Sequence, residues 1–141
     1  MIESIFALLQ KVGFTHPLHP MLVHVPMGMI IGMFVFSLLG LKWSKGPLPQ
    51  TAYHCSILAL ASVVPVILAG VMDWQHTLNG DWKSLIIVKM VLSAILTVLL
   101  AYAVIMRNKG ASPRHLFVVY SLCMVCAAGL GYSGGELVYG G

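Results

Sequence analysis

Side chains that could bind a haem or a metal ion occur at three separate places in the chain. They are imidazoles and carboxylates, in chain order His16, His19, His24, Asp73, His76 and Glu136. A neutral imidazole is a common ligand of haem iron, and imidazole together with carboxylate oxygen also suits zinc or copper. These residue types therefore indicate redox or metal chemistry, provided that the fold brings the three places together.

The composition of the chain places these residues in a membrane protein. The 141 residues include eight Lys or Arg and four Asp or Glu, and 59% are hydrophobic. Because a soluble domain is roughly 25% charged, this chain could not cover a soluble fold with polar groups. We therefore exclude a soluble enzyme, a disordered tail, a disulfide scaffold and a solenoid. The basic residues lie in short loops and do not indicate nucleic-acid binding.

Four apolar windows separate the charged residues, and each is long enough to cross about 30 Å of hydrocarbon as a helix. They lie near 20–41, 51–72, 84–106 and 115–133. Because short loops join the windows, neighbouring spans must be antiparallel. The sequence therefore predicts an all-α fold, an integral membrane antiparallel four-helix bundle over residues 15–141, in contact with the lipid bilayer.

Residues 1–14 precede this bundle and have a pattern of their own. Apolar side chains recur there at helical spacing, at Ile2, Ile5, Phe6 and Leu9. This pattern predicts a short amphipathic helix that lies in the membrane interface. The segment has neither a basic start nor a small-residue cleavage site, so we do not expect a cleavable signal peptide.

The distribution of basic residues predicts the orientation of the bundle. The connections after the first and third spans hold five basic residues and no acidic one: Lys42, Lys45, Arg107, Lys109 and Arg114. The opposite side is roughly balanced in charge. By the positive-inside bias, the two basic connections face the cytoplasm and both termini face outward.

This orientation brings the candidate ligands to one depth, at or just inside the outer face. Ionisable side chains within a membrane are costly, and they usually face the bundle or mark a functional path. Lys89 lies about one and a half turns into the third span on the same side. It could pair with Asp73 or Glu136, or it could neutralise the carboxylate of a ligand.

His24 and His76 are the best-placed pair of haem ligands, because they lie on the first two spans at this depth. His19 could replace either of them. Gly28 and Gly32 leave one face of the helix without side chains just below His24, which would give a haem room. Faces made of small residues also serve close helix packing. The histidine spacing favours one haem b over two.

Other interpretations of the histidines remain open. The six side chains named first could hold a copper or zinc ion in a metal-binding or transport protein, and the nearby methionines favour Cu(I). The chain could also be a homo-oligomer or a structural subunit of a larger membrane redox complex, with the polar cluster capping the bundle. At the opposite, cytoplasmic end, His54 and His115 could form a second haem site, although histidine is also common at membrane interfaces.

Cys123 and Cys126 form a C-M-V-C sequence inside the fourth span. Near mid-membrane, cysteines at this spacing are typically small packing residues, so we do not expect a redox pair. The sequence contains no nucleophile–base pair, phosphate loop or paired-carboxylate motif. Hydrolytic chemistry is therefore not expected, and any enzymatic role would be that of an oxidoreductase component.

Three motifs resemble those of an uncharacterised bacterial family of four-helix membrane proteins, a domain of unknown function. They are H-P-M-L-V-H-V-P at 19–26, G-V-M-D-W at 70–74 and G-G-E-L-V-Y at 134–139. The resemblance covers roughly residues 14–139, and by position the family motif residues are His19, Pro20, His24, Pro26, Asp73, Trp74, Gly134, Gly135 and Glu136. Members of this family occur alone or fused to cytochrome c or Rieske iron–sulphur modules, which implies membrane redox chemistry.

The residues and the resemblance together predict a multi-pass protein of the bacterial inner (cytoplasmic) membrane with periplasmic termini. We expect it to bind b-type haem at the outer face through the histidines named above. It would exchange electrons between a quinone in the bilayer and a periplasmic carrier, either a cytochrome or an iron–sulphur protein.

Overall fold

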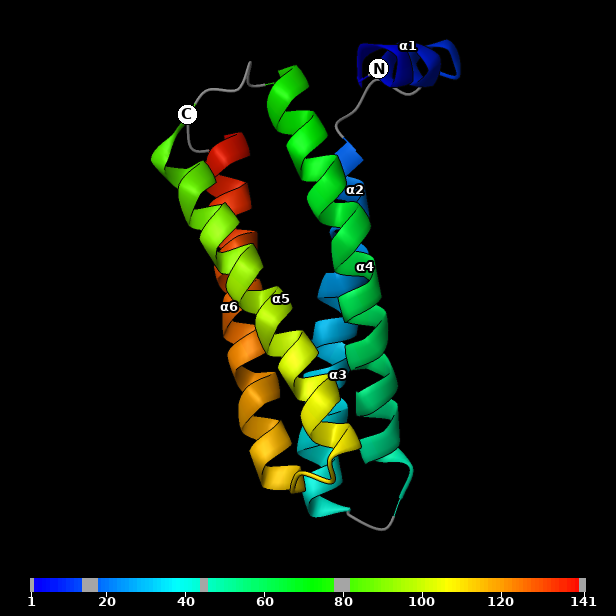
Figure 1. Cartoon of the computed structure of the whole chain (residues 1–141), viewed down its shortest axis with the longest axis vertical. Coiled ribbons are helices and arrows are strands. Elements are labelled where there is room, and N and C mark those ends of the chain that lie inside the picture. The colour runs from blue at the N-terminus through cyan, green and yellow to red at the C-terminus, as the bar shows by residue number, and fades with distance from the viewer. Residues whose placement is uncertain (1, 14–17, 44–45, 78–81, 140–141) are drawn as a thin grey trace.

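The computed structural model describes residues 2–13, 18–43, 46–77 and 82–139. Within these residues the regular structure is entirely helical. The helices are α1 (Ile2–Lys11), α2 (Leu18–Leu22), α3 (His24–Lys42), α4 (Leu48–Thr77), α5 (Ser84–Asn108) and α6 (Pro113–Tyr139) (Figure 1).

Four helical stretches are long and apolar enough to cross a membrane. They are His19–Lys42, Leu48–Gln75, Ser84–Asn108 and Pro113–Glu136. Large apolar side chains such as Leu58, Val98 and Val125 are exposed on the outside of these stretches, where they contact lipid. The predicted all-α four-helix membrane bundle is therefore confirmed.

The four spans alternate in direction and pack in a ring (Figure 1). Around the ring, α3 packs on α4, α4 on α5, α5 on α6, and α6 on α3, so that α4 and α6 are diagonal neighbours. We call the end that holds α2, the last turns of α4 and α6 and the first turns of α5 the termini end, because both chain termini lie there. The opposite end, with the α3–α4 and α5–α6 connections, is the loop end.

The first span is interrupted at Val23, between α2 and α3. Pro26 has no backbone N–H to donate to the carbonyl of Leu22, as the sequence indicates. The flanking bonds still form: the Val23 amide donates to the His19 carbonyl at 3.0 Å and the Met27 amide to the Val23 carbonyl at 3.2 Å. α2 packs against α4.

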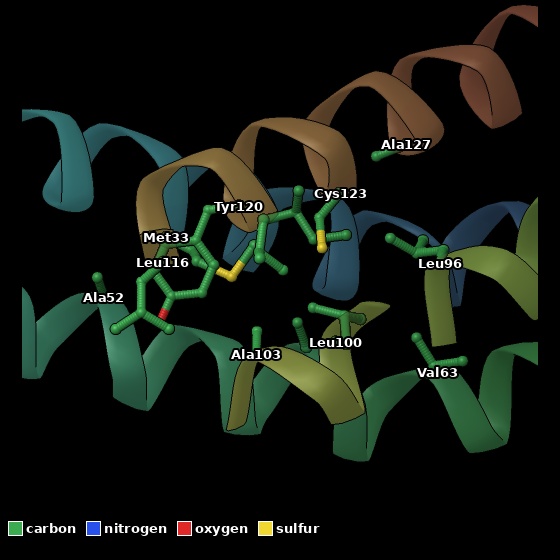
Figure 2. Packing of buried hydrophobic residues seen from close by; sticks show 13 residues of the cluster. Met33, Ala52, Val63, Leu96, Leu100, Ala103, Leu116, Tyr120, Cys123 and Ala127 are labelled. Atoms are coloured by element: carbon green, nitrogen blue, oxygen red, sulfur yellow. The ribbon is translucent and has the colours of Figure 1, made fainter. Parts of the chain in front are cut away.

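Side chains from all four spans form one hydrophobic core (Figure 2). The core members are Ile30, Met33, Ala52, Ala59, Val63, Leu96, Leu100, Ala103, Leu116, Val119, Tyr120, Cys123 and Ala127. On α4 and α5 they lie between the middle of the helix and the loop end. Cys123 is fully buried in this core, and Cys126 packs against it, which agrees with a packing role for both.

The helix α1 lies across the long direction of the bundle and contacts α4 (Figure 1). Ile5 and Leu8 on this helix are exposed. An exposed apolar face is what an interfacial helix would present to lipid. The location of α1 in the interface stays a prediction.

Replacing Leu100 with Ala should destabilise the bundle, because Leu100 is 0% exposed at the centre of the core. Truncating it leaves a cavity, and we expect the free energy of unfolding to fall by about 2–3 kcal/mol. Val98→Ala is the matched control, since Val98 lies on the same helix and is 68% exposed. It should change the free energy by less than about 0.5 kcal/mol. Denaturation in mixed micelles, followed by circular dichroism, measures both variants, and equal losses would contradict this core.

Candidate functional site

Hydrogen bonds from two places on α4 hold His19 in position. Its Nδ1 lies 3.1 Å from the carbonyl oxygen of Val66, and its backbone N–H donates to Oδ2 of Asp73 at 2.8 Å. A carbonyl oxygen only accepts hydrogen bonds, so Nδ1 carries the proton and donates it to Val66. In the neutral imidazole this tautomer leaves the lone pair on Nε2.

A glycine on α4 allows the His19 ring to come this close. A Cβ atom at Gly70 would lie 3.0 Å from Nδ1 of His19, closer than such atoms normally approach. Val66, Gly70 and Asp73 are spaced by four and three residues and therefore share one face of α4. Along this face, the Val66 carbonyl accepts from the ring, the Gly70 position leaves room for the ring, and the Asp73 carboxylate accepts from the backbone amide of His19.

Asp73 has a structural role in addition to its charge. The first amides of a helix have no acceptor within that helix, and in the hydrocarbon of a membrane they have little access to water. The Asp73 carboxylate provides such an acceptor for His19, the second residue of α2. A charge-assisted bond of this kind is stronger than one between neutral groups, so Asp73 anchors α2 to α4.

Lys89 reaches the same region from α5. Its side chain is half-buried, and its Nζ lies 4.0 Å from the position that a Cβ on Gly134 of α6 would occupy. Lys89 and Asp73 both lie within electrostatic range of the His19 ring. The site at the termini end therefore joins His19 on α2, Asp73 on α4, Lys89 on α5 and Gly134 on α6.

The other predicted ligands at this end are less well placed or lie outside the described part. His24 is exposed at the first residue of α3, and Glu136 is exposed on α6. His16 lies outside the described residues, and the side chain of His76 lies outside the described part of α4. The pairing of His24 with His76 as haem ligands stays a prediction.

Gly28 and Gly32 of α3, the two glycines predicted near the site, differ in their surroundings. A Cβ on Gly32 would lie 3.4 Å from Sγ of Cys55, whereas a Cβ on Gly28 would meet nothing within 4 Å. Gly32 therefore lets α3 pack closely on α4, which is the packing role that small residues often have in membranes. Gly28 leaves open space below His24, as the sequence indicates for that position.

His54 and His115 at the loop end have separate polar neighbours. Nε2 of His54 lies 3.2 Å from Nε2 of Gln50, and Nε2 of His115 lies 3.1 Å from the hydroxyl of Tyr102. Both histidines are exposed, and they lie on α4 and α6, which are diagonal in the ring. This arrangement favours the interfacial interpretation over a second haem shared by the pair.

A complete shell of metal ligands is not formed by the described residues alone. Across residues 2–13, 18–43, 46–77 and 82–139, no three His, Cys, Asp or Glu side chains are grouped closely enough to hold a metal ion. Copper or zinc at the termini end would therefore need donors such as His16 or His76 in addition to His19 and Asp73.

Sequence reasoning did not identify Val66 and Gly70 as parts of the site. The signal for Gly70 was present, since it begins the G-V-M-D-W motif and lies three residues before Asp73. Val66 contributes through its backbone carbonyl, which every residue type has, so its side chain carries no signal.

Two aromatic residues, Trp74 and Trp82, flank the α4–α5 connection here, with ring centroids 4.9 Å apart in an edge-on contact.

The model of one protein family matches residues 15–141, and that family is described as "Predicted membrane protein (DUF2231)". The match includes all three motifs and every residue of the site at the termini end. No curated protein and no solved structure matches the chain.

Replacing Gly70 with Val should displace the His19 ring, because the new side chain would occupy the space beside Nδ1. We expect the free energy of unfolding to fall by about 1–3 kcal/mol, as for other overpacked sites. Nitrogen-15 NMR of labelled histidine should show the loss of the Nδ1–H hydrogen bond to Val66. Gly28→Ala is the control, and it should be neutral or stabilise the helix by up to about 1 kcal/mol. An unchanged His19 signal in the Gly70 variant would refute this geometry.

Proposed function

The chain belongs to the DUF2231 family and is a multi-pass membrane protein, and from this premise we propose that it transfers electrons through one b-type haem bound by His19. The observation that carries the proposal is the hydrogen bond from Nδ1 of His19 to the Val66 carbonyl. The same bond would also serve a bare metal ion. The choice of haem therefore rests also on the cytochrome c and Rieske modules to which proteins with similar motifs are fused.

Histidines that bind metals usually donate their second ring N–H to a carbonyl or carboxylate. That bond fixes the tautomer, orients the ring and makes the ligating nitrogen more basic. His19 has such a bond at Nδ1, and Gly70 keeps the ring close against α4. Nε2 of His19 would therefore be suited to hold a haem iron, and His24 or His76 would supply the second ligand.

The polar site and the apolar core occupy different parts of the bundle, and this separation suits a cofactor at the membrane edge. The core packs mainly towards the loop end, whereas His19, Asp73 and Lys89 gather at the termini end. When bound, haem supplies a one-electron iron couple. The chain would hold it where a quinone can approach through the bilayer and a soluble cytochrome or iron–sulphur protein can approach from water.

The orientation that we propose has the termini end at the periplasmic face of a bacterial inner membrane. Its support is the charge of the two connections at the loop end, which carry basic residues and no acidic ones. Such connections are retained in the cytoplasm. The His19 site would then open towards the periplasm and its soluble electron carriers.

Purification in mild detergent from haem-replete cells tests the proposal directly. We expect a Soret band, and α-band absorption after reduction, at about one haem per chain. His19→Ala should remove most of this absorption, because it removes the proposed ligand of the haem iron. His54→Ala and Cys126→Ala are the controls and should leave the spectrum unchanged, because both residues lie away from the termini end.

A colourless protein from such cells would refute haem binding. Elemental analysis of the same sample then separates the alternatives, since stoichiometric copper or zinc without haem would indicate a metal-binding protein. Loss of the band in His24→Ala or His76→Ala would identify the second axial ligand.

Reporter fusions test the proposed orientation. Alkaline phosphatase, which is active only outside the cytoplasm, should be active when fused after Gly141 and inactive when fused after Lys109 in the loop-end connection. A green fluorescent protein fusion at the same two positions should give the opposite result. Phosphatase activity at position 109 alone would show that the positive-inside bias fails for this chain.

A further inference from the structure

We propose that the termini end binds one oxyanion group, a carboxylate or a phosphate, on the ammonium of Lys89 between α5 and α6. The group would belong either to a propionate of the bound haem or to the headgroup of an anionic phospholipid. The first source rests on the proposed function, whereas the second does not.

The first step is the position of Lys89 in the membrane. It lies inside the span Ser84–Asn108 and is half-buried, with its Nζ at Gly134. An ammonium in such a place is costly unless a partner compensates for the water it has lost. In the described part of the chain, Lys89 makes no ion pair or hydrogen bond. A ligand that supplies negative charge would remove this cost.

The second step concerns the acidic residues that could have supplied the charge. Asp73 directs one carboxylate oxygen to the backbone N–H of His19. Glu136 is exposed on α6, two residues beyond Gly134. Neither forms an ion pair with Lys89 within the described residues, so the ammonium can accept a partner from outside the chain.

The third step is the room beside the ammonium. Gly134 has no side chain to fill the space next to Nζ, and a Cβ on the adjacent Gly135 would meet nothing within 4 Å. The two consecutive glycines therefore place no side chain of their own beside the ammonium. The charge of Lys89 also acts on the His19 imidazole.

These features select the chemistry of the ligand. A compact ammonium binds carboxylate or phosphate oxygens as a point charge, with charge-assisted hydrogen bonds. Partial exclusion of water strengthens such a pair relative to one at an exposed site. A neutral ligand of the same shape would leave the ammonium without compensation. The site should therefore bind an anionic ligand more tightly than a neutral ligand of the same shape.

Two pairs of ligands, each matched in shape but not in charge, test this inference on the full-length protein in neutral detergent. One pair is haemin and haemin dimethyl ester, followed by absorption titration. The other is phosphatidylglycerol and diacylglycerol with the same acyl chains, followed by native mass spectrometry. In one pair at least, the wild-type protein should bind the anionic member about tenfold more tightly, the equivalent of about 1.4 kcal/mol.

Variants of Lys89 then assign the discrimination to its charge. Lys89→Gln should abolish the tenfold preference and Lys89→Arg should retain it. Lys83→Gln is the matched control, because Lys83 lies at the same end of α5 but is exposed. The ligand-free Lys89→Gln protein should melt at the same temperature as the wild type or above it, because an uncompensated buried charge has been removed. A purely structural lysine would instead lower the melting temperature and leave the preference intact.

The outcomes separate this inference from the proposed function. If no haem binds but phosphatidylglycerol is preferred through Lys89, the proposed function fails and the oxyanion site remains, with a lipid phosphate as its ligand. If haem binds and neither pair is discriminated, the proposed function remains and the oxyanion site is refuted. A preference that survives in Lys89→Gln also refutes it.

Discussion

Backbone polar groups in the hydrocarbon of a membrane must find their partners within the protein, and this constraint shapes the whole chain. It is the reason why the four apolar windows fold as long helices. It also applies at the start of the first span, where the first amides of α2 have no acceptor within that helix. There the Asp73 carboxylate accepts from the amide of His19, so an acidic side chain of α4 completes a helix of the preceding span.

The same contact that anchors α2 also prepares His19 for chemistry. With its backbone N–H held by Asp73 and its Nδ1 by Val66, the ring has a defined direction and a defined tautomer. Gly70 is required because a larger residue would push the ring away from α4. Structural and functional demands therefore meet in one short stretch of α4, which corresponds to the G-V-M-D-W motif and the turn before it.

The apolar core and the polar residues of the site lie towards different ends of the bundle. Small and medium apolar side chains fill the core towards the loop end, where Leu100 and Cys123 are fully buried. Polar groups from four helices gather at the termini end, including Lys89 beside Gly134. A tightly packed half can hold the helices in place while the other half keeps room between them. This division would let the site bind a ligand without loss of the fold.

The sequence by itself determined the number of spans, their order and the end of the bundle at which the ionisable residues gather. Hydropathy and charge spacing suffice for this, because they fix the depth of each residue along a helix. The tertiary structure decided which residues at that depth meet. It favoured His19, since contact depends on the rotation of each helix about its axis and on the packing of α2 against α4. The Val66 carbonyl entered the site for the same reason: a backbone acceptor is common to every residue, and only packing selects one of them.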